Sequence, residues 1–143
     1  MLVEQILEAK GRAVATGAPE STVSDAVRML ADNNIGALVV SRDGRAVDGI
    51  VSERDIVRQL TSEADVLGRR VDDLMERDVA TCDCRTDTEE LMNTMTTRRF
   101  RHVPVVDHGE LCGIVSIGDV VKARIDELAT ETQQLVGYIQ NGR

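Results

Sequence analysis

Apolar residues along this chain follow two spacings, one typical of helices and one typical of short buried strands. In the first half they recur at i, i+3, i+4 and i+7, which predicts an amphipathic helix with Thr22 as its N-cap. The second half repeats this pattern and predicts a helix from about Thr88. The two apolar faces comprise Val23, Ala26, Val27 and Leu30, and then Leu91, Met92 and Met95.

Three short apolar segments accompany each of these helices and predict strands. One precedes the helix, one follows it, and the third comes after a turn in which glycine supplies the positive φ of a tight hairpin. Each half is therefore predicted to be β-α-β-β-α, because another helix begins where the third strand ends. The expected strands are Val14 to Thr16, Ala37 to Val40 and Val47 to Val51, and then Val79 to Thr81, Val103 to Val106 and Leu111 to Val115.

The two halves are copies of one unit. Placing Val79 on Val14 aligns the helices and the strands that follow them, and one deleted residue in the second turn then aligns Gly113 with Gly49. A unit of about 60 residues buries too little apolar surface to be stable alone, so the copies are expected to share a core. The expected fold class is α/β, or α+β, with two tandem repeats in a pseudo-two-fold pair, residues 1–68 and residues 69–143.

Further helices are expected before each repeat and after the second. The two short ones are indicated by Leu2, Ile6 and Leu7, and by Val71, Leu74 and Met75. The last helix is expected from Ser116 to about Ile139, with apolar positions that step alternately by four and three as in a coiled coil. The stripe could pack on its own domain, but because such a helix is longer than a small domain can cover, we expect it to dimerise with a second copy. Its stripe comprises Val121, Ile125, Leu128, Thr132, Leu135 and Ile139.

Composition narrows the classes of partner. The 143 residues include 25 acidic and 17 basic side chains, for a formal charge of −8, and the aromatic residues are Phe100 and Tyr138 alone. The net negative charge argues against nucleic acid or an anionic membrane as the main partner, and few aromatic rings are available to stack on single strands. No apolar run approaches the ~20 residues that a bilayer span needs.

The three cysteines, Cys82, Cys84 and Cys112, are odd in number and lack the spacing of a disulfide framework. They are interpreted as reduced thiols, and together with the absence of a signal-peptide pattern they predict a cytoplasmic protein. Cys82 and Cys84 near His102 are a weak candidate for a metal site, because a second matched pair of ligands is missing. Packing is the preferred interpretation, and no metal is expected.

The segment Gly-h-h-Ser-x-x-Asp, where h is apolar, occurs twice. Its serine and aspartate are Ser52 and Asp55 in the first copy and Ser116 and Asp119 in the second. One interpretation is structural, since such a pair forms a capping box at the start of a helix. The other is chemical: free N–H groups at a helix start suit phosphate, and an ionised carboxylate can accept both hydroxyls of a ribose diol. Two copies at equivalent positions favour a nucleotide site.

The duplicated unit, with Gly-Ile-Val-Ser-Glu-Arg-Asp and Gly-Ile-Val-Ser-Ile-Gly-Asp, resembles a pair of CBS domains, the Bateman module, over residues 10–127. The resemblance implies clefts that bind an adenosine compound such as AMP, ADP, ATP, NAD(H) or S-adenosylmethionine. It implies that the aspartate holds the ribose, that the serine lies by ribose or phosphate, and that the strand after each helix lines the adenine pocket. It carries over as nucleotide-binding residues Thr16, Ala37, Leu38, Ser52, Arg54, Asp55, Thr81, Arg101, His102, Val103, Pro104, Ser116 and Asp119.

The two clefts are expected to differ in charge. The segment from Arg98 to His102 concentrates positive charge that would attract a phosphate, although its first two arginines also suit a helix C-terminus. Arg54 lies in the first turn of a predicted helix, where a nearby phosphate would offset the unfavourable dipole, and its counterpart is Gly118. The family's strand proline is kept only in the second half, which leaves the second cleft nearer to the family's nucleotide-binding pattern.

The expected function is that of a non-enzymatic sensor, a homodimer that binds an adenosine nucleotide and changes its shape or its affinity for an unknown downstream protein. An enzyme is disfavoured, because His102 and His108 are the only histidines and no Ser/His/Asp, Cys/His or Walker-type arrangement can be assembled. The alternative is a ligand-free structural adaptor that uses the repeats and the last helix, since capping alone accounts for both Ser–Asp pairs.

Overall fold

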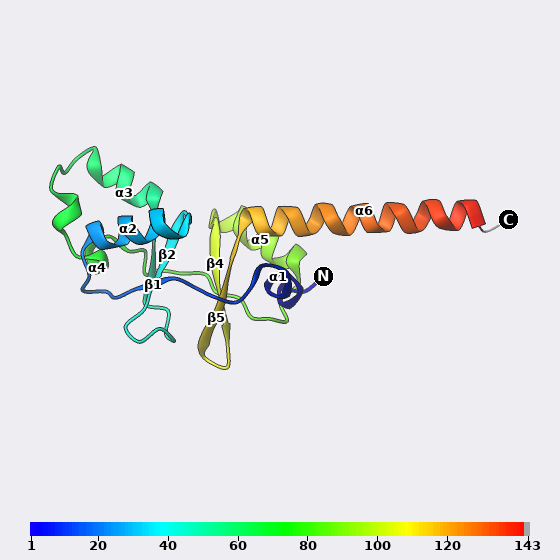
Figure 1. Cartoon of the computed structure of the whole chain (residues 1–143), viewed down its shortest axis with the longest axis horizontal. Coiled ribbons are helices and arrows are strands. Elements are labelled where there is room, and N and C mark those ends of the chain that lie inside the picture. The colour runs from blue at the N-terminus through cyan, green and yellow to red at the C-terminus, as the bar shows by residue number, and fades with distance from the viewer. Residues whose placement is uncertain (142–143) are drawn as a thin grey trace.

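The computed structural model describes residues 1–141; residues 142 and 143, which end the second predicted repeat, lie outside the described residues. The order of elements confirms the predicted β-α-β-β-α pattern in the first half, and short helices precede each repeat as predicted (Figure 1). The elements are α1 (Val3–Lys10), β1 (Thr16–Gly17), α2 (Val23–Asn33), β2 (Ala37–Val40), β3 (Gly49–Ser52), α3 (Glu53–Leu60), a 3₁₀ turn (Val66–Gly68), α4 (Val71–Leu74), α5 (Thr88–Arg98), β4 (His102–Asp107), β5 (Glu110–Ser116) and α6 (Ile117–Asn141).

The two repeats differ at their first strand. In the first repeat β1 pairs parallel with β2 and β2 pairs antiparallel with β3, whereas β4 and β5 of the second form an antiparallel pair. The strand predicted at Val79 to Thr81 is wrong, since pairing there is reduced to a single parallel bridge between Cys82 and Val105. Pro104 explains the difference, because it has no N–H to extend the ladder toward the residues before Cys82.

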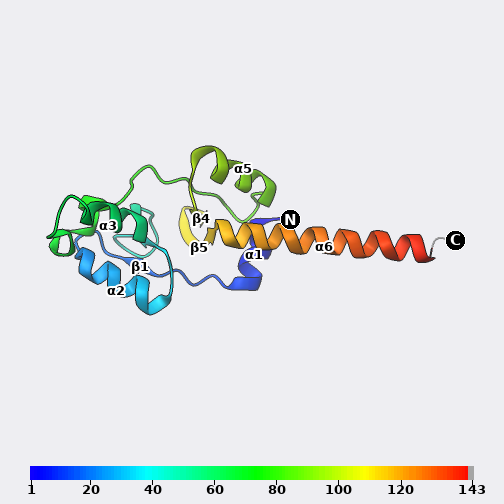
Figure 2. The same cartoon turned by 90° about the horizontal axis from the view of Figure 1, so that it is seen from above.

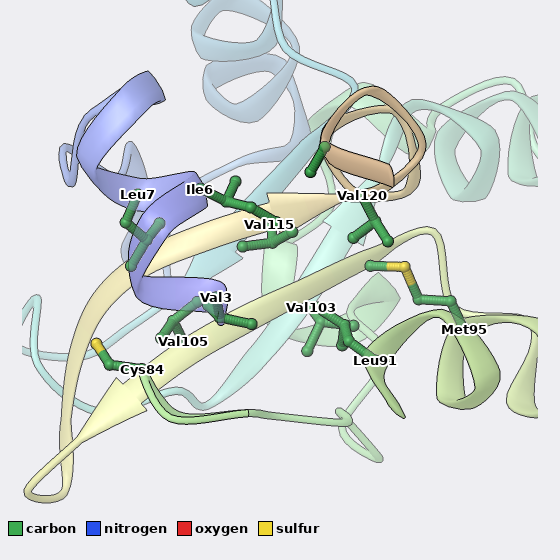
Figure 3. Close-up of a cluster of buried hydrophobic side chains, with 11 residues drawn as sticks. Val3, Ile6, Leu7, Cys84, Leu91, Met95, Val103, Val105, Val115 and Val120 are labelled. Carbon is green, nitrogen blue, oxygen red and sulfur yellow. The ribbon is translucent and has the colours of Figure 1, made fainter. Parts of the chain in front are cut away.

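Each repeat is completed by a helix that precedes the other repeat in the sequence. The core of the first repeat includes Val71 and Met75 from the α4 region, and the core of the second includes Val3, Ile6 and Leu7 from α1. Figure 3 shows these α1 side chains against the sheet residues of the second core. The predicted boundary between residues 68 and 69 separates the repeats in the sequence. It does not separate the two cores, because each core contains residues from both sides of this boundary.

The motif glycines are explained by this exchange of helices. A Cβ built on Gly49 would lie 2.6 Å from Met75 Sδ, and one built on Gly113 would lie 2.7 Å from Leu7 Cδ2. Both distances are too short for real carbon contacts, so each glycine makes room for a side chain of the crossing helix. These side-chain contacts place α1 and the end of α4 next to the strands that lead into the two Ser–Asp motifs.

Helix α6 extends far beyond the rest of the molecule (Figures 1 and 2). Its 25 residues span about 37 Å, and most of its predicted apolar stripe is exposed. Ile125, Leu135 and Ile139 each leave about three-fifths of their area in solvent, namely 60%, 61% and 60%. Of the helices within residues 1–141, none combines the length and the apolar character that crossing a membrane requires.

Candidate functional site

Two adjacent clefts lie where the repeats meet, and they share Gly36, Ala37 and His102. We name them by their motif serines. The Ser52 cleft has a volume of about 270 Å³, and the Ser116 cleft about 590 Å³, within or near the range of small-molecule sites. Besides the shared residues, the Ser52 cleft is lined by Ile50, Ser52, Glu53, Arg54, Asp55, Arg58, Glu76, Arg99, Phe100 and Arg101, and the Ser116 cleft by Lys10, Ala13, Val14, Ala15, Asn33, Asn34, Ile35, Ile114 and Ser116.

The first motif forms the capping box that its spacing predicts. Asp55 N–H donates to Ser52 Oγ at 3.2 Å, while Asp55 Oδ2 accepts from Ser52 N–H at 3.0 Å and from Ser52 Oγ at 2.9 Å. Both residues line the cleft, and within residues 1–141 the second carboxylate oxygen, Oδ1, has no hydrogen-bond donor. Capping and ligand binding are therefore compatible at this aspartate, because the cap uses one oxygen and leaves the other free.

The helix starts offer fewer free amides than the sequence suggested. Glu53 N–H, the first of α3, donates to Gly36 O at 3.0 Å, and Ile117 N–H, the first of α6, donates to Arg101 O at 2.8 Å. With Asp55 N–H bound to Ser52 Oγ, Arg54 N–H alone among the first three amides of α3 has no acceptor within residues 1–141. A phosphate in this cleft would consequently rely on side-chain cations more than on backbone N–H groups.

The second motif has the same cap and an added cation. Ser116 N–H donates to Asp119 Oδ2 at 2.9 Å, and Asp119 N–H donates to Ser116 Oγ at 3.1 Å. Lys10 Nζ, from the end of α1, donates to the same Oδ2 at 2.7 Å and to Ile114 O at 2.9 Å. Burial alone would raise the pKa of Asp119, but hydrogen bonds from Lys10 and Ser116 together lower it. Asp119 is thus an ionised carboxylate that already has a partner.

Positive charge gathers in the Ser52 cleft. Arg54 and Arg58 come from α3 of the first repeat, and Arg99 and Arg101 come from the segment between α5 and β4 of the second. The basic segment of the second repeat therefore faces the motif of the first, whereas the strand proline of the second repeat favours the second cleft as the nucleotide site. Four guanidinium groups against three carboxylates favour an anionic ligand group here.

Arg98 has a different role from its neighbours. Its guanidinium carbon lies 4.9 Å from the centroid of the Phe100 ring, and its Nη2 lies 3.5 Å from Asp78 Oδ1. It does not line either cleft. Arg98, the last residue of α5, therefore stabilises the end of this helix by a cation–π contact with Phe100 and an exposed ion pair with Asp78.

His102 lines both clefts at the start of β4. Burial is the largest effect on its pKa and lowers it, and the charge of Lys10 lowers it further against the opposing effects of Asp119 and Glu53. The imidazole is therefore neutral near pH 7 and offers one donor and one acceptor between the clefts.

The remaining predicted residues lie outside the two linings. Leu38 and Val103 are fully buried in the first and second cores, and Pro104 is buried beside them in β4. Thr16 begins β1 and pairs with Val39, while Thr81 is exposed before the Cys82 bridge. These residues shape the strands behind the clefts. Of the predicted residues, the two clefts bring together Ala37, Ser52, Arg54, Asp55, Arg101, His102 and Ser116. Asp119 lies outside both linings, but it accepts a hydrogen bond from Lys10, which lines the Ser116 cleft.

Several lining residues were not anticipated. Lys10 lies 109 positions from Asp119 in the sequence, so no local pattern indicates their contact. Asn33 and Asn34 end α2, where Asn34 adopts a left-handed conformation that is typical of a helix C-cap. Arg58 follows Arg54 by one helical turn, a spacing that would have placed it on the same face of α3.

No group of three or more His, Cys, Asp or Glu side chains within residues 1–141 is arranged to hold a metal ion. The thiols of Cys82, Cys84 and Cys112 line neither the Ser52 cleft nor the Ser116 cleft.

Comparisons with known proteins agree with this architecture. A family model described as CBS domain matches residues 12–62 and 71–126. The CBS domain-containing protein CBSX3, mitochondrial, of Arabidopsis thaliana is 37% identical over 154 residues, which cover 98% of this chain and 72% of that protein.

Two solved structures extend the comparison. The CBS-domain containing protein ATU1752 from Agrobacterium tumefaciens is 42% identical with a TM-score of 0.83, over 87% of this chain and 99% of that one. CBSX2 in complex with AMP is 28% identical with a TM-score of 0.67, over 79% of this chain and 88% of that one.

Proposed function

This chain belongs to the CBS-domain family, and from that premise we propose that it is a non-enzymatic sensor of adenosine nucleotides. Proteins of this kind are regulatory modules, and a structural neighbour has been solved in complex with AMP. Of the compounds that the family resemblance implies, AMP, ADP, ATP and NAD(H) fit the charge of the Ser52 cleft, whereas S-adenosylmethionine carries no phosphate.

The observation that carries this proposal is the combination of groups in the Ser52 cleft. Asp55 offers a free carboxylate oxygen to a ribose hydroxyl, and its capping partner Ser52 fixes the carboxylate in place. Arg54, Arg99 and Arg101 stand in the same cleft, ready to bind phosphate oxygens through charge-assisted hydrogen bonds. A sugar acceptor next to a cluster of guanidinium groups is the chemistry that a nucleotide needs.

The quaternary structure that we propose is a homodimer formed through α6. Its stripe keeps the four-and-three spacing of a coiled coil, and Ile125, Leu135 and Ile139 are more than half exposed. A second copy of the same stripe has matching spacing and apolar character. The dimer would join two nucleotide modules, and ligand binding would change their arrangement only as far as the ligand prefers one arrangement over the other.

A ligand-free adaptor is the second candidate. It is favoured by the complete capping boxes at Ser52 and Ser116, which stabilise helix starts without any ligand. In that case α6 alone would provide the function, by binding a partner.

A thermal-shift screen separates the two candidates. AMP, ADP, ATP, NAD, NADH and S-adenosylmethionine are each added in excess to the purified chain. The sensor predicts a higher unfolding midpoint with at least one phosphate-bearing compound, because a ligand of the native state stabilises it by mass action. An unchanged midpoint with all of them would favour the adaptor.

The reduced thiols also suggest a reducing compartment such as the cytoplasm.

A further inference from the structure

Cys84 and Cys112 form a pair of neighbouring thiols, and Cys112 lies toward the end of β5 opposite to Ser116. Cys84 Sγ lies 3.9 Å from Cys112 Sγ, although the residues are 28 positions apart. Cys84 belongs to the loop before α5, and Cys112 lies in β5. Figure 3 shows Cys84 at the edge of the apolar cluster that α1 completes. We propose that Cys84 and Cys112 are an oxidisable pair that forms a disulfide in response to a peroxide.

Cys84 is the sulfur that reacts first. Arg12 Nη1 donates to Cys84 Sγ at 3.6 Å, and this contact is the main reason that the pKa of Arg12 is raised. A cation at this distance stabilises the negative charge that a sulfur carries when it attacks a peroxide. Cys84 is 9% exposed and lines a cleft of about 330 Å³, through which a small peroxide can reach it. The other residues of this cleft are Arg12, Arg85, His108, Glu4, Asp83 and Asp107, so the guanidinium of Arg12 and not the overall charge of the cleft favours Cys84.

Cys112 completes the reaction. In the first step the Cys84 thiol gives up its proton and the thiolate attacks one peroxide oxygen, so that the O–O bond breaks and Cys84 sulfenic acid forms. The hydroxide that leaves takes up the proton released by Cys84 and becomes the first water. In the second step the Cys112 sulfur attacks the Cys84 sulfur and the sulfenic oxygen leaves as water after taking up the thiol proton. The balance is two thiols and one hydrogen peroxide giving one disulfide and two waters. Burial and the contact with Cys84 raise the pKa of Cys112 to about 11, so Cys112 enters the second step as a protonated thiol.

Cys82 is excluded from the pair by its surroundings. Burial is the main effect that raises its pKa to about 12, and no guanidinium contacts its sulfur within residues 1–141. Its backbone is held in the bridge to Val105, with hydrogen bonds to Pro104 O and from Val106 N–H. Cys82 is therefore the natural internal control for oxidation of the other two.

The disulfide would fix the contact between α1 and the second repeat. Cys84 O accepts from Glu4 N–H of α1 at 3.0 Å, and Cys112 precedes Gly113, on which Leu7 of α1 packs. A disulfide between Cys84 and Cys112 would close a loop over 28 positions and so reduce the conformational entropy of the unfolded chain. Oxidation is expected to raise the unfolding midpoint without a change in fold.

The test is oxidation of the full chain by a small excess of hydrogen peroxide, followed by intact mass and peptide mapping. We expect a mass loss of about 2 Da, from two hydrogens, and one cross-linked peptide pair that contains Cys84 and Cys112. Of the three thiols, Cys82 should stay reduced, and dithiothreitol should return the other two to thiols. The variant Cys82→Ser should behave like the parent, whereas Cys84→Ser and Cys112→Ser should each lose the intramolecular disulfide.

Three results would overturn the proposal. They are a disulfide that includes Cys82, a bond between two chains in place of the internal one, and peroxide-treated chains in which Cys84 ends as a sulfinic acid or stays a thiol. The mapping of the parent chain decides among these even if a serine variant does not fold. The readout requires no nucleotide, so it is independent of the function proposed above.

Discussion

Lys10 Nζ donates a hydrogen bond of 2.7 Å to Asp119 Oδ2, whereas Asp55, the equivalent aspartate of the first repeat, pairs with no cation among residues 1–141. The two motifs have the same sequence pattern and the same cap, yet Asp55 lines the Ser52 cleft, whereas Asp119 lies behind Lys10 and Ser116, outside the lining of the Ser116 cleft. The charge of Asp119 is compensated by Lys10 of α1, whereas the charge of Asp55 is available to a ligand.

Replacing Lys10 tests whether this contact weakens binding at Asp119. Lys10 Nζ donates to Asp119 Oδ2, so its positive charge reduces the negative charge that this carboxylate offers to a ribose hydroxyl. In an Asp55→Ala background, Lys10→Met should strengthen AMP binding to the Ser116 cleft by up to about fivefold, the effect of an exposed ion pair of at most ~1 kcal/mol. Isothermal titration calorimetry measures this. A weaker or unchanged affinity would mean that Lys10 does not compete with the ligand.

The same contact predicts a dependence of stability on pH. The folded chain lowers the pKa of Asp119 below its ordinary value of 3.8. The resulting stabilisation is complete above pH 3.8 and is lost as the pH falls through the lowered value, because protonation breaks the contact with Lys10. Carboxyl NMR titration of Lys10→Met should show a higher pKa for Asp119 than in the parent. An equal pKa in both proteins would show that Lys10 does not set it.

Arg101 is predicted to bind the phosphate of the ligand. Arg101→Ala should weaken AMP binding about tenfold, the usual effect of losing a hydrogen bond to a charged group, and should leave adenosine binding unchanged. The matched control is Arg98→Ala, since Arg98 stands three residues away and contacts Phe100 and Asp78 without lining a cleft. If both variants lost AMP affinity equally, the effect would be one of general charge.

The stripe on α6 predicts a dimer that charge disrupts. The double substitution Ile125→Glu and Leu128→Glu places carboxylates in the proposed seam, where burying an unpaired charge is strongly unfavourable. Light scattering should then give the mass of a monomer. Gln133→Glu with Gln134→Glu adds the same charge off the stripe and should leave the mass of a dimer. A parent chain that is already monomeric would contradict the α6 interface.

Local features of this chain were predictable from the sequence because their partners lie within one helical turn. Thr22 caps α2 as predicted, with its hydroxyl accepting from Asp25 N–H at 3.1 Å, and Ser52 and Ser116 cap α3 and α6 in the same way. Contacts between distant segments were not predictable. Neither the contact of Lys10 with Asp119 nor the position of Arg99 in the Ser52 cleft leaves a periodic signal, because each depends on how the repeats pack.

One error in the predicted fold has an identifiable cause. The alignment of the repeats transferred the strand at Val14 to Thr16 onto Val79 to Thr81, where the structure has none. The alignment itself holds, since the pair Gly17 and Val40 corresponds to the pair Cys82 and Val105. A single missing N–H at Pro104 changes the pairing while the hydrophobic pattern stays the same.

The role of the motif aspartates is tested most directly by comparing two capping residues. Asp55 and Asp25 make the same box, each accepting from the backbone N–H of its cap residue, at 3.0 Å and 3.2 Å, but only Asp55 lines a cleft. Calorimetric titration with AMP should show that Asp25→Ala binds like the parent, whereas Asp55→Ala loses at least about tenfold in affinity at the Ser52 cleft. The folding stability of both variants should fall by a similar part of the ~0.5–2 kcal/mol that a cap contributes. Undiminished AMP affinity in Asp55→Ala would mean that this carboxylate only caps the start of α3.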